Sequence, residues 1–285
     1  MIGYYLALAF GRLLSWLPFW VLYLFSDFIY FILRYVLKYR HQVIVGNLRR
    51  SFPNKSEDWY LKKRNQFYKN FSDIIVESFK SLSISAKEME KRFTLINKEV
   101  FDKLYDQNRG VIMVMGHQTN FEWVATAIPL LVKQNCYAVY HKLKNPRFNK
   151  LIVSIREKFG LKLFPMADTY PFMLNNPDKA PLYVFMADQS PHKGKIRYRT
   201  QFLNQSTPVH LGVENLSKKC DLAVVFIDIQ RTKRGHYQIT PELLYFDTKE
   251  TEQYEVTDRH VKALEKNILR SPQNWLWSHK RWKHA

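Results

Sequence analysis

Along the middle of the chain, short apolar runs alternate with segments in which apolar residues recur at helical spacing. This pattern predicts strands separated by helices. Between the strands, apolar residues recur at helical spacing over Asn120–Val132 and Pro146–Phe159. The alternation predicts an α/β fold, a central mixed sheet flanked by helices. Short apolar runs typical of buried strands lie at Val111–Met115, Cys136–Tyr140, Pro181–Ala187 and Ala223–Ile229.

A long amphipathic helix is predicted ahead of these strands. Ser56, followed by Glu57 and Asp58, is a typical helix start. On this helix we expect Glu77 and Lys80 at the surface or behind a site rather than in catalysis. The apolar residues that recur at helical spacing are Phe67, Phe71, Ile74, Ile75, Phe79 and Leu82.

The stretch over residues 13–33 is almost entirely apolar, with Asp27 as its only charge and Pro18 as its one helix breaker. As a single helix it would measure about 30 Å, enough to cross the hydrocarbon core of a membrane. Basic residues follow directly, which favours a cytoplasmic location for the rest of the chain. We therefore expect residues 1–40 to anchor a single α/β domain over residues 41–285. The alternatives are a helix lying in one leaflet and a buried core helix.

Composition indicates a kind of partner without choosing one. The 285 residues carry a net charge of +19, so an anionic partner is expected: nucleic acid, an anionic membrane surface or an acidic substrate. The apolar fraction of 46% is ample for a folded core. Cys136 and Cys220 lack CxxC spacing and are expected to be reduced residues of the core.

Cofactor motifs are missing from the sequence. The nine glycines form neither GxGxxG nor GxxxxGK[ST], so a nucleotide held by such a loop is not expected. Histidines and cysteines lack metal-ligand spacing, and we predict no metal and no other cofactor. His279 and His284 lie in a basic tail, where we expect solvated side chains or contacts with phosphate.

The candidate chemistry lies where the first predicted strand ends. Gly116 is expected to allow a tight turn before His117, and Glu122 lies in the first turn of the next helix. If Glu122 folds back onto the imidazole and accepts one ring N–H, the other nitrogen becomes a better base. Such a pair can deprotonate a hydroxyl for attack on an activated acyl carbon. Alternatively, His117 only bonds a loop and Glu122 only caps the helix.

Six ordered segments carry a resemblance to a known family. They are "LPFWVLYLFSDFIYFILRYVLKYR", "NLRRSFP", "FYKNFSDIIVESFK", "GHQTNFEW", "MADQS" and "PQNWLWSHKRWK". Together they resemble the late acyltransferases of lipid A biosynthesis, the lauroyl and myristoyl transferases, which carry HxxxxE or HxxxxD behind a membrane segment. The FPEG-like and PxxxG blocks of glycerolipid acyltransferases are not evident. The resemblance implies a glycerolipid-acyltransferase-like fold and places the catalytic histidine and carboxylate on His117 and Glu122.

Further site residues follow from the resemblance. The family's arginine corresponds to Arg156, with Arg147 as the substitute, and its later aspartate corresponds to Asp188. An Arg156–Asp188 pair is expected to orient a phosphate or to support the acceptor; a solvated arginine and a strand-end cap are the alternatives. Asn120 and Gln189 are expected to support the site or to bind substrate.

The resemblance also implies the partners. The donor is an acyl chain on acyl carrier protein or coenzyme A, and the acceptor is a phosphorylated glycolipid, lipid A or its precursor. These anionic partners account for the net charge without nucleic acid. The expected location is the inner membrane, with the catalytic domain facing the cytoplasm. Near the C-terminus, Trp275, Trp277 and Trp282 among basic residues suit a membrane headgroup surface, with a folded core tail as the alternative.

Two other functions stay open at this point. The residues "QTNF" between His117 and Glu122 and the modest length differ from those expected for some lipid A enzymes. The same chemistry could therefore act on a lysophospholipid or an aminolipid. A non-catalytic, membrane-tethered binder of anionic lipid or nucleic acid is the alternative from another class, although such a binder has no need of the His–Glu motif.

Overall fold

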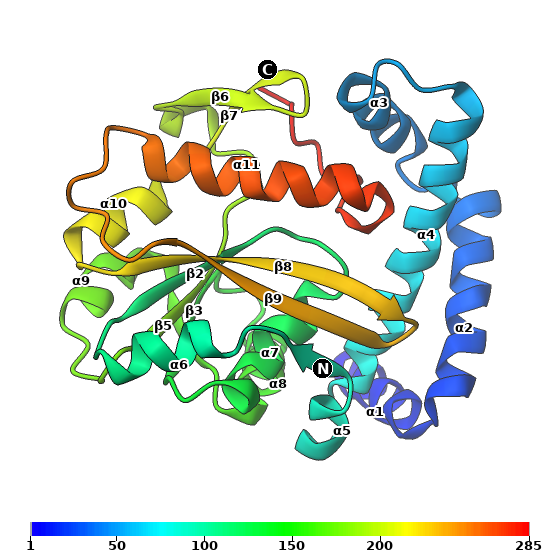
Figure 1. Ribbon diagram of the computed structural model, residues 1–285. Coiled ribbons are helices and arrows are strands. Elements are labelled where there is room, and N and C mark those ends of the chain that lie inside the picture. Colours follow the sequence, from blue (N-terminus) through cyan, green and yellow to red (C-terminus); the bar gives the residue numbers. More distant parts are fainter. Residues whose placement is uncertain (1, 285) are drawn as a thin grey trace.

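A computed structural model describes residues 2–284 of the chain and contains a seven-stranded sheet in the order β1-β9-β8-β2-β5-β3-β4 (Figure 1). Neighbouring strands are parallel except β8 and β9, which form a long antiparallel hairpin. The predicted mixed α/β sheet is confirmed. The strands are β1 (Phe93–Leu95), β2 (Val111–Met115), β3 (Cys136–Tyr140), β4 (Lys162–Pro165), β5 (Leu182–Met186), β8 (Ala223–Lys233) and β9 (His236–Tyr245).

Helices cover both faces of the sheet, as Figure 1 shows. Helices α10 (Gly212–Lys219) and α11 (Glu255–Arg270) lie on one face, and α6 (Glu99–Asp106), α7 (Phe121–Leu131) and α8 (Pro146–Arg156) on the other. Strand β2 sends Ile112 and Val114 into the first core and Val111, Met113 and Met115 into the second. Because side chains of a strand alternate between faces, this fully apolar strand is buried on both sides.

The sequence pattern located the central strands but missed others. Strand β9 alternates buried and more exposed residues instead of forming an apolar run, and it contains Pro241. Strands β1 and β4 span only three and four residues at the two edges of the sheet. The other unpredicted elements include α3 (His41–Ser51), α6, α10, α11, a hairpin of β6 (Arg199–Phe202) and β7 (Gln205–Pro208), and the short helices α5 (Ala86–Glu90) and α9 (Thr169–Leu174).

Helix α4 (Glu57–Lys80) begins as predicted, because the side chain of Ser56 accepts a hydrogen bond from the Trp59 N–H at 3.3 Å. Of the two positions expected for Glu77, the surface and a place behind the site, the structure shows the second: Glu77 is fully buried and accepts a hydrogen bond from Asn120 at 2.7 Å. The Lys80 ammonium donates to the carbonyls of Ser15 and Leu17, at 2.8 and 2.9 Å, and so satisfies the end of α1 (Ile2–Trp16).

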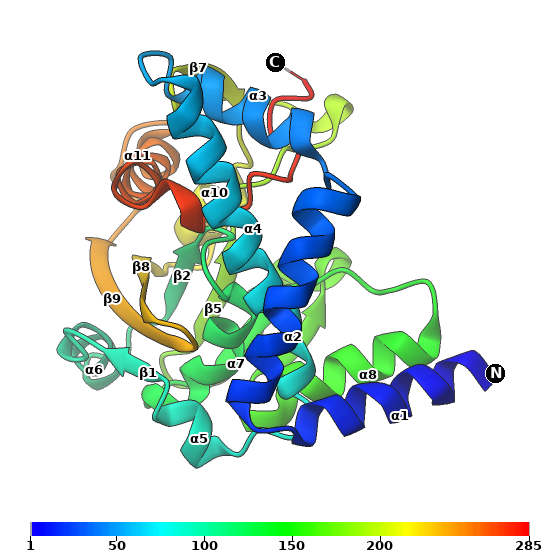
Figure 2. The same cartoon turned by 90° about the vertical axis from the view of Figure 1, so that its right-hand side faces the viewer.

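The N-terminal apolar stretch is divided between two helices instead of forming the single helix expected over residues 13–33. Helix α1 ends at Trp16, and α2 (Phe19–Phe31) starts after Pro18 and continues through a π-helical turn at Ile32–Val36. The segment Phe19–Val36 is long and apolar enough to cross a membrane. It nevertheless lies along α4, and α3 (His41–Ser51) connects the end of this segment to the start of α4 (Figure 2).

Helix α2 holds polar groups on the side that faces the domain. Tyr23 donates to Glu77 at 2.9 Å, Ser26 donates to Asp73 at 2.5 Å, and Asp27 pairs with Arg234 at 2.7 Å. The opposite side is apolar and exposed. Together with α1 and the following turn, it displays Phe10, Leu13, Trp16, Trp20, Leu24, Phe25, Phe28, Phe31, Tyr35, Val36 and Leu37.

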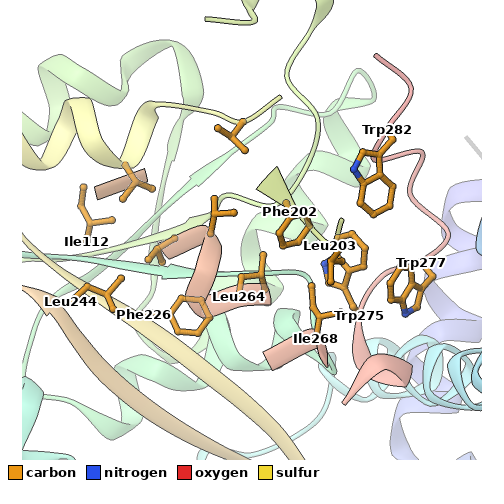
Figure 3. Packing of buried hydrophobic residues seen from close by; sticks show 14 of the residues in the cluster. Ile112, Phe202, Leu203, Phe226, Leu244, Leu264, Ile268, Trp275, Trp277 and Trp282 are labelled. Atoms are coloured by element: carbon orange, nitrogen blue, oxygen red, sulfur yellow. The ribbon is translucent and has the colours of Figure 1, made fainter. Parts of the chain in front are cut away.

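The C-terminal tryptophans belong to the core, so the expectation of a membrane headgroup surface is wrong. Trp275, Trp277 and Trp282 are at most 8% exposed and pack with Phe202 and Ile268 (Figure 3). Their indole N–H groups donate to the Asp188 carboxylate, the Pro272 carbonyl and the Thr207 hydroxyl, respectively. With each polar end paired, these large rings can be buried.

The cysteines agree with the sequence analysis. Cys136 is buried in strand β3, Cys220 is partly buried at the end of α10, and both are free thiols. Burial raises the pKa of the Cys136 thiol to about 12, so this thiol stays neutral at physiological pH.

Candidate active site

His117 lies two residues beyond β2, the central strand of the sheet. The preceding Gly116 is required for space rather than for a tight turn, which corrects the expectation. A Cβ atom at this position would lie 2.6 Å from Leu264 Cδ1 and 3.2 Å from Asp188 Oδ2. The left-handed backbone in this loop is at Thr119, with φ of 47°.

The partner of His117 is Asp188, not Glu122. His117 Nδ1 lies 2.5 Å from Asp188 Oδ1, and the His117 backbone N–H donates to Asp188 Oδ2 at 2.8 Å. The indole N–H of Trp275 also donates to Oδ2 at 2.8 Å. Strands β2 and β5 are parallel neighbours in which Met115 pairs with Met186, so the residues two positions further on are side by side. Asp188 thus holds both the ring and the backbone of His117.

The electrostatics of the His117–Asp188 pair favour the charged form of both side chains. Burial disfavours the imidazolium, but the charge of Asp188 and its hydrogen bond outweigh this effect, so the pKa of His117 is raised above its ordinary value. Burial also disfavours the Asp188 carboxylate, but His117 and the Trp275 N–H lower its pKa well below the ordinary range. Asp188 is therefore an ionised acceptor that fixes the proton of His117 on Nδ1.

The second ring nitrogen of His117 is oriented toward the site. Gln189 Nε2 lies 3.2 Å from His117 Nε2 and can donate to it. Because Nδ1–H is bound to a carboxylate, the lone pair of Nε2 is the one that can accept a proton. Gln189, expected as a supporting residue, thus contacts the candidate base directly.

Glu122 forms an ion pair with Arg156, so the expected pairing of Arg156 with Asp188 is wrong. Arg156 donates from Nε and Nη2 to the two carboxylate oxygens of Glu122, at 2.9 and 2.6 Å. Both side chains are about 30% exposed. The pair acts on the pKa of His117, which Glu122 raises and Arg156 lowers. Arg156 rather than Arg147 is therefore the arginine of this site.

Asn120 lies behind the site. Its side chain is buried, accepts from the Trp123 N–H at 3.0 Å and donates to Glu77 at 2.7 Å. Asn120 is the N-cap of α7, the helix that carries Glu122 in its first turn. It therefore supports the site by fixing where this helix begins.

An apolar cavity of about 760 Å³ extends from His117. Glu122 and Arg156 line it near His117, and the remaining wall is mostly aliphatic and aromatic, from α7, β3, α8, β4, β5 and α10. A cavity of this size lies within the range of about 300–1,000 Å³ typical of small-molecule sites. Representative apolar residues of the wall are Phe121, Val139, Leu143, Ile152, Leu161, Leu163, Met166, Phe185, Val213 and Leu216.

The C-terminal segment contributes residues that sequence reasoning placed in a solvated tail. His279 is half-buried, accepts from the Ser190 N–H at 3.4 Å, and has a pKa lowered by burial to about 4. Arg281 is buried near Asp188, and burial lowers its pKa to about 10. The signal that could have found them was their place in the segment "PQNWLWSHKRWK".

Within residues 2–284, no group of three or more His, Cys, Asp or Glu side chains is arranged to hold a metal ion. The chemistry available from the described side chains is that of an oriented imidazole base next to a charged Glu–Arg pair. This arrangement, in the wall of an apolar cavity, suits proton abstraction from a hydroxyl and stabilisation of charge on an acyl group.

Residues 1–284 match the model of a family described as bacterial lipid A biosynthesis acyltransferase. The chain belongs to this family. The protein is therefore an acyltransferase, and the match covers both the site and the N-terminal helices. A search of curated proteins finds no match.

Proposed function

We propose that this lipid A biosynthesis acyltransferase moves a fatty acyl chain from a thioester of acyl carrier protein or coenzyme A to a hydroxyl of lipid A or its precursor. The observation that carries the proposal is the position of His117. It is oriented by Asp188 and borders an apolar cavity of about 760 Å³. A hydrocarbon chain in this cavity would bring its thioester carbonyl to the base.

The reaction follows from the orientation of the imidazole. Nε2 of His117 takes the proton of the acceptor hydroxyl as its oxygen attacks the thioester carbonyl carbon. The tetrahedral intermediate then collapses, the C–S bond breaks, and the imidazolium returns the proton to the leaving thiolate. Asp188 keeps Nδ1 protonated throughout and stabilises the imidazolium, as carboxylates do in acyl-transfer dyads.

In this mechanism the Glu122–Arg156 pair supplies charge rather than a second base. Both residues line the cavity near His117. The oxyanion of the intermediate develops at this end of the cavity, and the guanidinium of Arg156 is the cation positioned to stabilise it. Glu122 then fixes the guanidinium plane through its two-point hydrogen bond.

Donor docking is assigned to the loop between β3 and α8. Lys142 and Lys144 are exposed there, and their neighbours His141 and Leu143 line the cavity. Acyl carrier protein and coenzyme A are both anionic, so positive charge at this cavity edge would attract either donor. This position supports a role for both lysines in docking the donor.

The membrane is assigned to the outer face of α1 and α2. Trp20, Leu24 and Phe28 recur every four residues and are each more than 60% exposed. The inner face of α2 holds hydrogen bonds and an ion pair to the domain. This division supports a helix embedded along one leaflet at the cytoplasmic face of the inner membrane, because spanning would put its polar face into hydrocarbon.

The function is tested with acyl carrier protein and coenzyme A that carry a labelled acyl chain. Each donor is offered to the purified protein with one acceptor at a time. The acceptors are a lipid A precursor, a lysophospholipid and an aminolipid. We expect labelled product with the lipid A precursor alone, and none above background with His117→Ala. Labelling of the lysophospholipid or aminolipid instead would overturn the acceptor assignment, and full activity of His117→Ala would overturn the mechanism.

Membrane binding is tested with the combined variant Trp20→Glu, Phe28→Glu. The fraction bound to anionic vesicles should fall, since two apolar anchors are replaced by charges. Lys262→Gln with Lys266→Gln on the exposed side of α11 changes the net charge equally and serves as the control. Equal loss in both variants would mean that charge alone holds the protein on the membrane.

A further inference from the structure

His117 borders a small space besides the apolar cavity. This space of about 10 Å³, room for about one water molecule, lies on the side of α4, and most of its lining residues are apolar. Three residues of this small space, Asn70, Gln273 and Asn274, also line a third cavity of about 280 Å³. The third cavity is therefore separated from the space beside His117 by one layer of side chains.

The third cavity, here called the polar cavity, lies between α4, the end of β8 and the segment Pro272–Asn274. Its described lining is polar throughout, with two basic residues and no acidic one. Five of its residues carry amide side chains that can both donate and accept hydrogen bonds. The lining consists of Gln66, Lys69, Asn70, Gln230, Arg231, Ser271, Gln273 and Asn274.

The wall of the polar cavity is fixed by hydrogen bonds. Arg231 donates to Asn70 at 2.6 Å and to the buried carboxylate of Asp73 at 2.5 Å. Asn70 donates to the side chain of Asn274 at 2.8 Å, and Lys63 donates to Gln273 at 2.9 Å. These bonds hold the lining side chains in place, which reduces the cost of ordering them around a ligand.

The same wall is attached to the His117 loop. The Thr119 N–H donates to the Asn274 carbonyl at 2.8 Å, and the Leu276 N–H donates to the His117 carbonyl at 3.1 Å. A ligand group in the polar cavity would therefore be held at a fixed position relative to the base. This is what a hydroxyl acceptor requires, since its oxygen must approach Nε2 from outside the apolar cavity.

We propose that the polar cavity binds the phosphorylated sugar headgroup of the acceptor, while the apolar cavity holds the acyl chain of the donor. This inference rests on the proposed function and names the acceptor subsite of the same site. Sugar hydroxyls match the amide-rich wall, and a phosphate matches Lys69 and Arg231. The acceptor hydroxyl would then reach His117 from the α4 side, opposite the thioester.

Lys69→Glu tests the inference, with Lys62→Glu as the matched control. Lys62 lies two turns earlier on α4, is also exposed, and is outside the described lining. Transfer is measured on a phosphorylated lipid A precursor and on its dephosphorylated form, at saturating donor. The quantity compared is the ratio of kcat/KM for the two acceptors.

We expect Lys69→Glu to lower this ratio about tenfold, equivalent to about 1.4 kcal/mol, through a higher KM for the phosphorylated acceptor. Lys62→Glu should keep the wild-type ratio. An unaltered ratio in Lys69→Glu would overturn the inference, and so would a rise in donor KM instead, which would assign the cavity to the donor's phosphates. If wild-type protein transfers to neither acceptor, the proposed function itself fails, so the two failures are distinguishable.

Discussion

Two buried carboxylates, Asp188 and Glu77, differ in what surrounds them. Within the described residues each accepts three hydrogen bonds and each is at most 6% exposed. The donors to Asp188 include an imidazole that can take up charge, and its pKa is lowered. The donors to Glu77 are the neutral side chains of Tyr23, Asn120 and Tyr237, and burial raises its pKa. The charge of the donors, more than their number, decides the state of each acid.

The comparison separates the carboxylate that positions the candidate base from a carboxylate that joins parts of the scaffold. Asp188 acts on the base through His117 Nδ1. Glu77 joins α2 through Tyr23, the β8–β9 hairpin through Tyr237, and the start of α7 through Asn120. Removing Asp188 should therefore alter the chemistry, whereas removing Glu77 should alter mainly the stability of the scaffold.

The largest expected effect is the loss of the base. His117→Ala should reduce the transfer rate by about 10²–10⁴-fold while the circular dichroism spectrum stays that of the folded protein, because general-base catalysis contributes about this factor. Initial rates with saturating donor and circular dichroism measure the two properties. A rate near that of wild type would show that His117 is not the base, and Asp188 would then have no part in the chemistry.

The next effect concerns the structural carboxylate. Glu77→Ala leaves Tyr23, Asn120 and Tyr237 without their shared acceptor, and each buried unpaired group costs about 1–3 kcal/mol. Urea unfolding should show a loss of several kcal/mol, and Glu77→Gln should lose less because an amide keeps one acceptor oxygen. Equal losses for Ala and Gln would mean that the hydrogen bonds to Glu77 contribute nothing measurable.

A smaller effect sharpens the comparison through pH. The pKa of Asp188 is lowered from 3.8, so its stabilisation is present above that pH and is lost as pH falls. The pKa of Glu77 is raised from 4.5, so its stabilisation is present below that pH and is lost as pH rises through the folded value. The stability advantage of wild type should therefore grow with pH against Asp188→Asn and shrink with pH against Glu77→Gln. Parallel slopes in urea unfolding would contradict the opposite assignments.

The smallest expected effect is on donor affinity. Reversing the charges of Lys142 and Lys144 should raise the donor KM a few-fold, with kcat changing less, because exposed charges act mainly on encounter. The wild-type donor KM should rise with salt, and this dependence should flatten in the variant. A salt-independent donor KM would show that these lysines do not dock the donor.

His117 and Asp188 and the strands that lead to them could be named from the sequence, but the pairing of the two side chains could not be predicted. His117 and Asp188 each follow an apolar run by two residues, a visible pattern. Strand β5, however, is inserted between β2 and β3, although it follows both in the chain. Contacts that depend on strand order arise from tertiary packing, so the nearer Glu122 looked like the partner.

The same reason explains the errors at the two ends of the chain. The apolar N-terminal stretch predicted a single helix, but Pro18 divides it, and Ser26 and Asp27 are paired with residues far away in sequence. The basic, tryptophan-rich C-terminus resembled a membrane surface because the partners of two of its three indoles, Asp188 and Thr207, are also distant in the sequence. Local pattern indicates which segments are apolar, and only the fold decides whether lipid or protein covers them.

The pH dependence of kcat/KM in wild type, Asp188→Asn and Glu77→Gln tests the central claim that Asp188 tunes His117. Activity requires neutral His117, so the wild-type rate should rise with pH through a midpoint above 6.5. The charge of Glu122 raises the pKa of His117, and the charge of Arg156 lowers it. Without the Asp188 charge, burial should lower the pKa of His117, moving the midpoint to lower pH while the plateau rate falls. Glu77→Gln should keep the wild-type midpoint. A midpoint that stays in place in Asp188→Asn, or that moves equally in Glu77→Gln, would contradict the account.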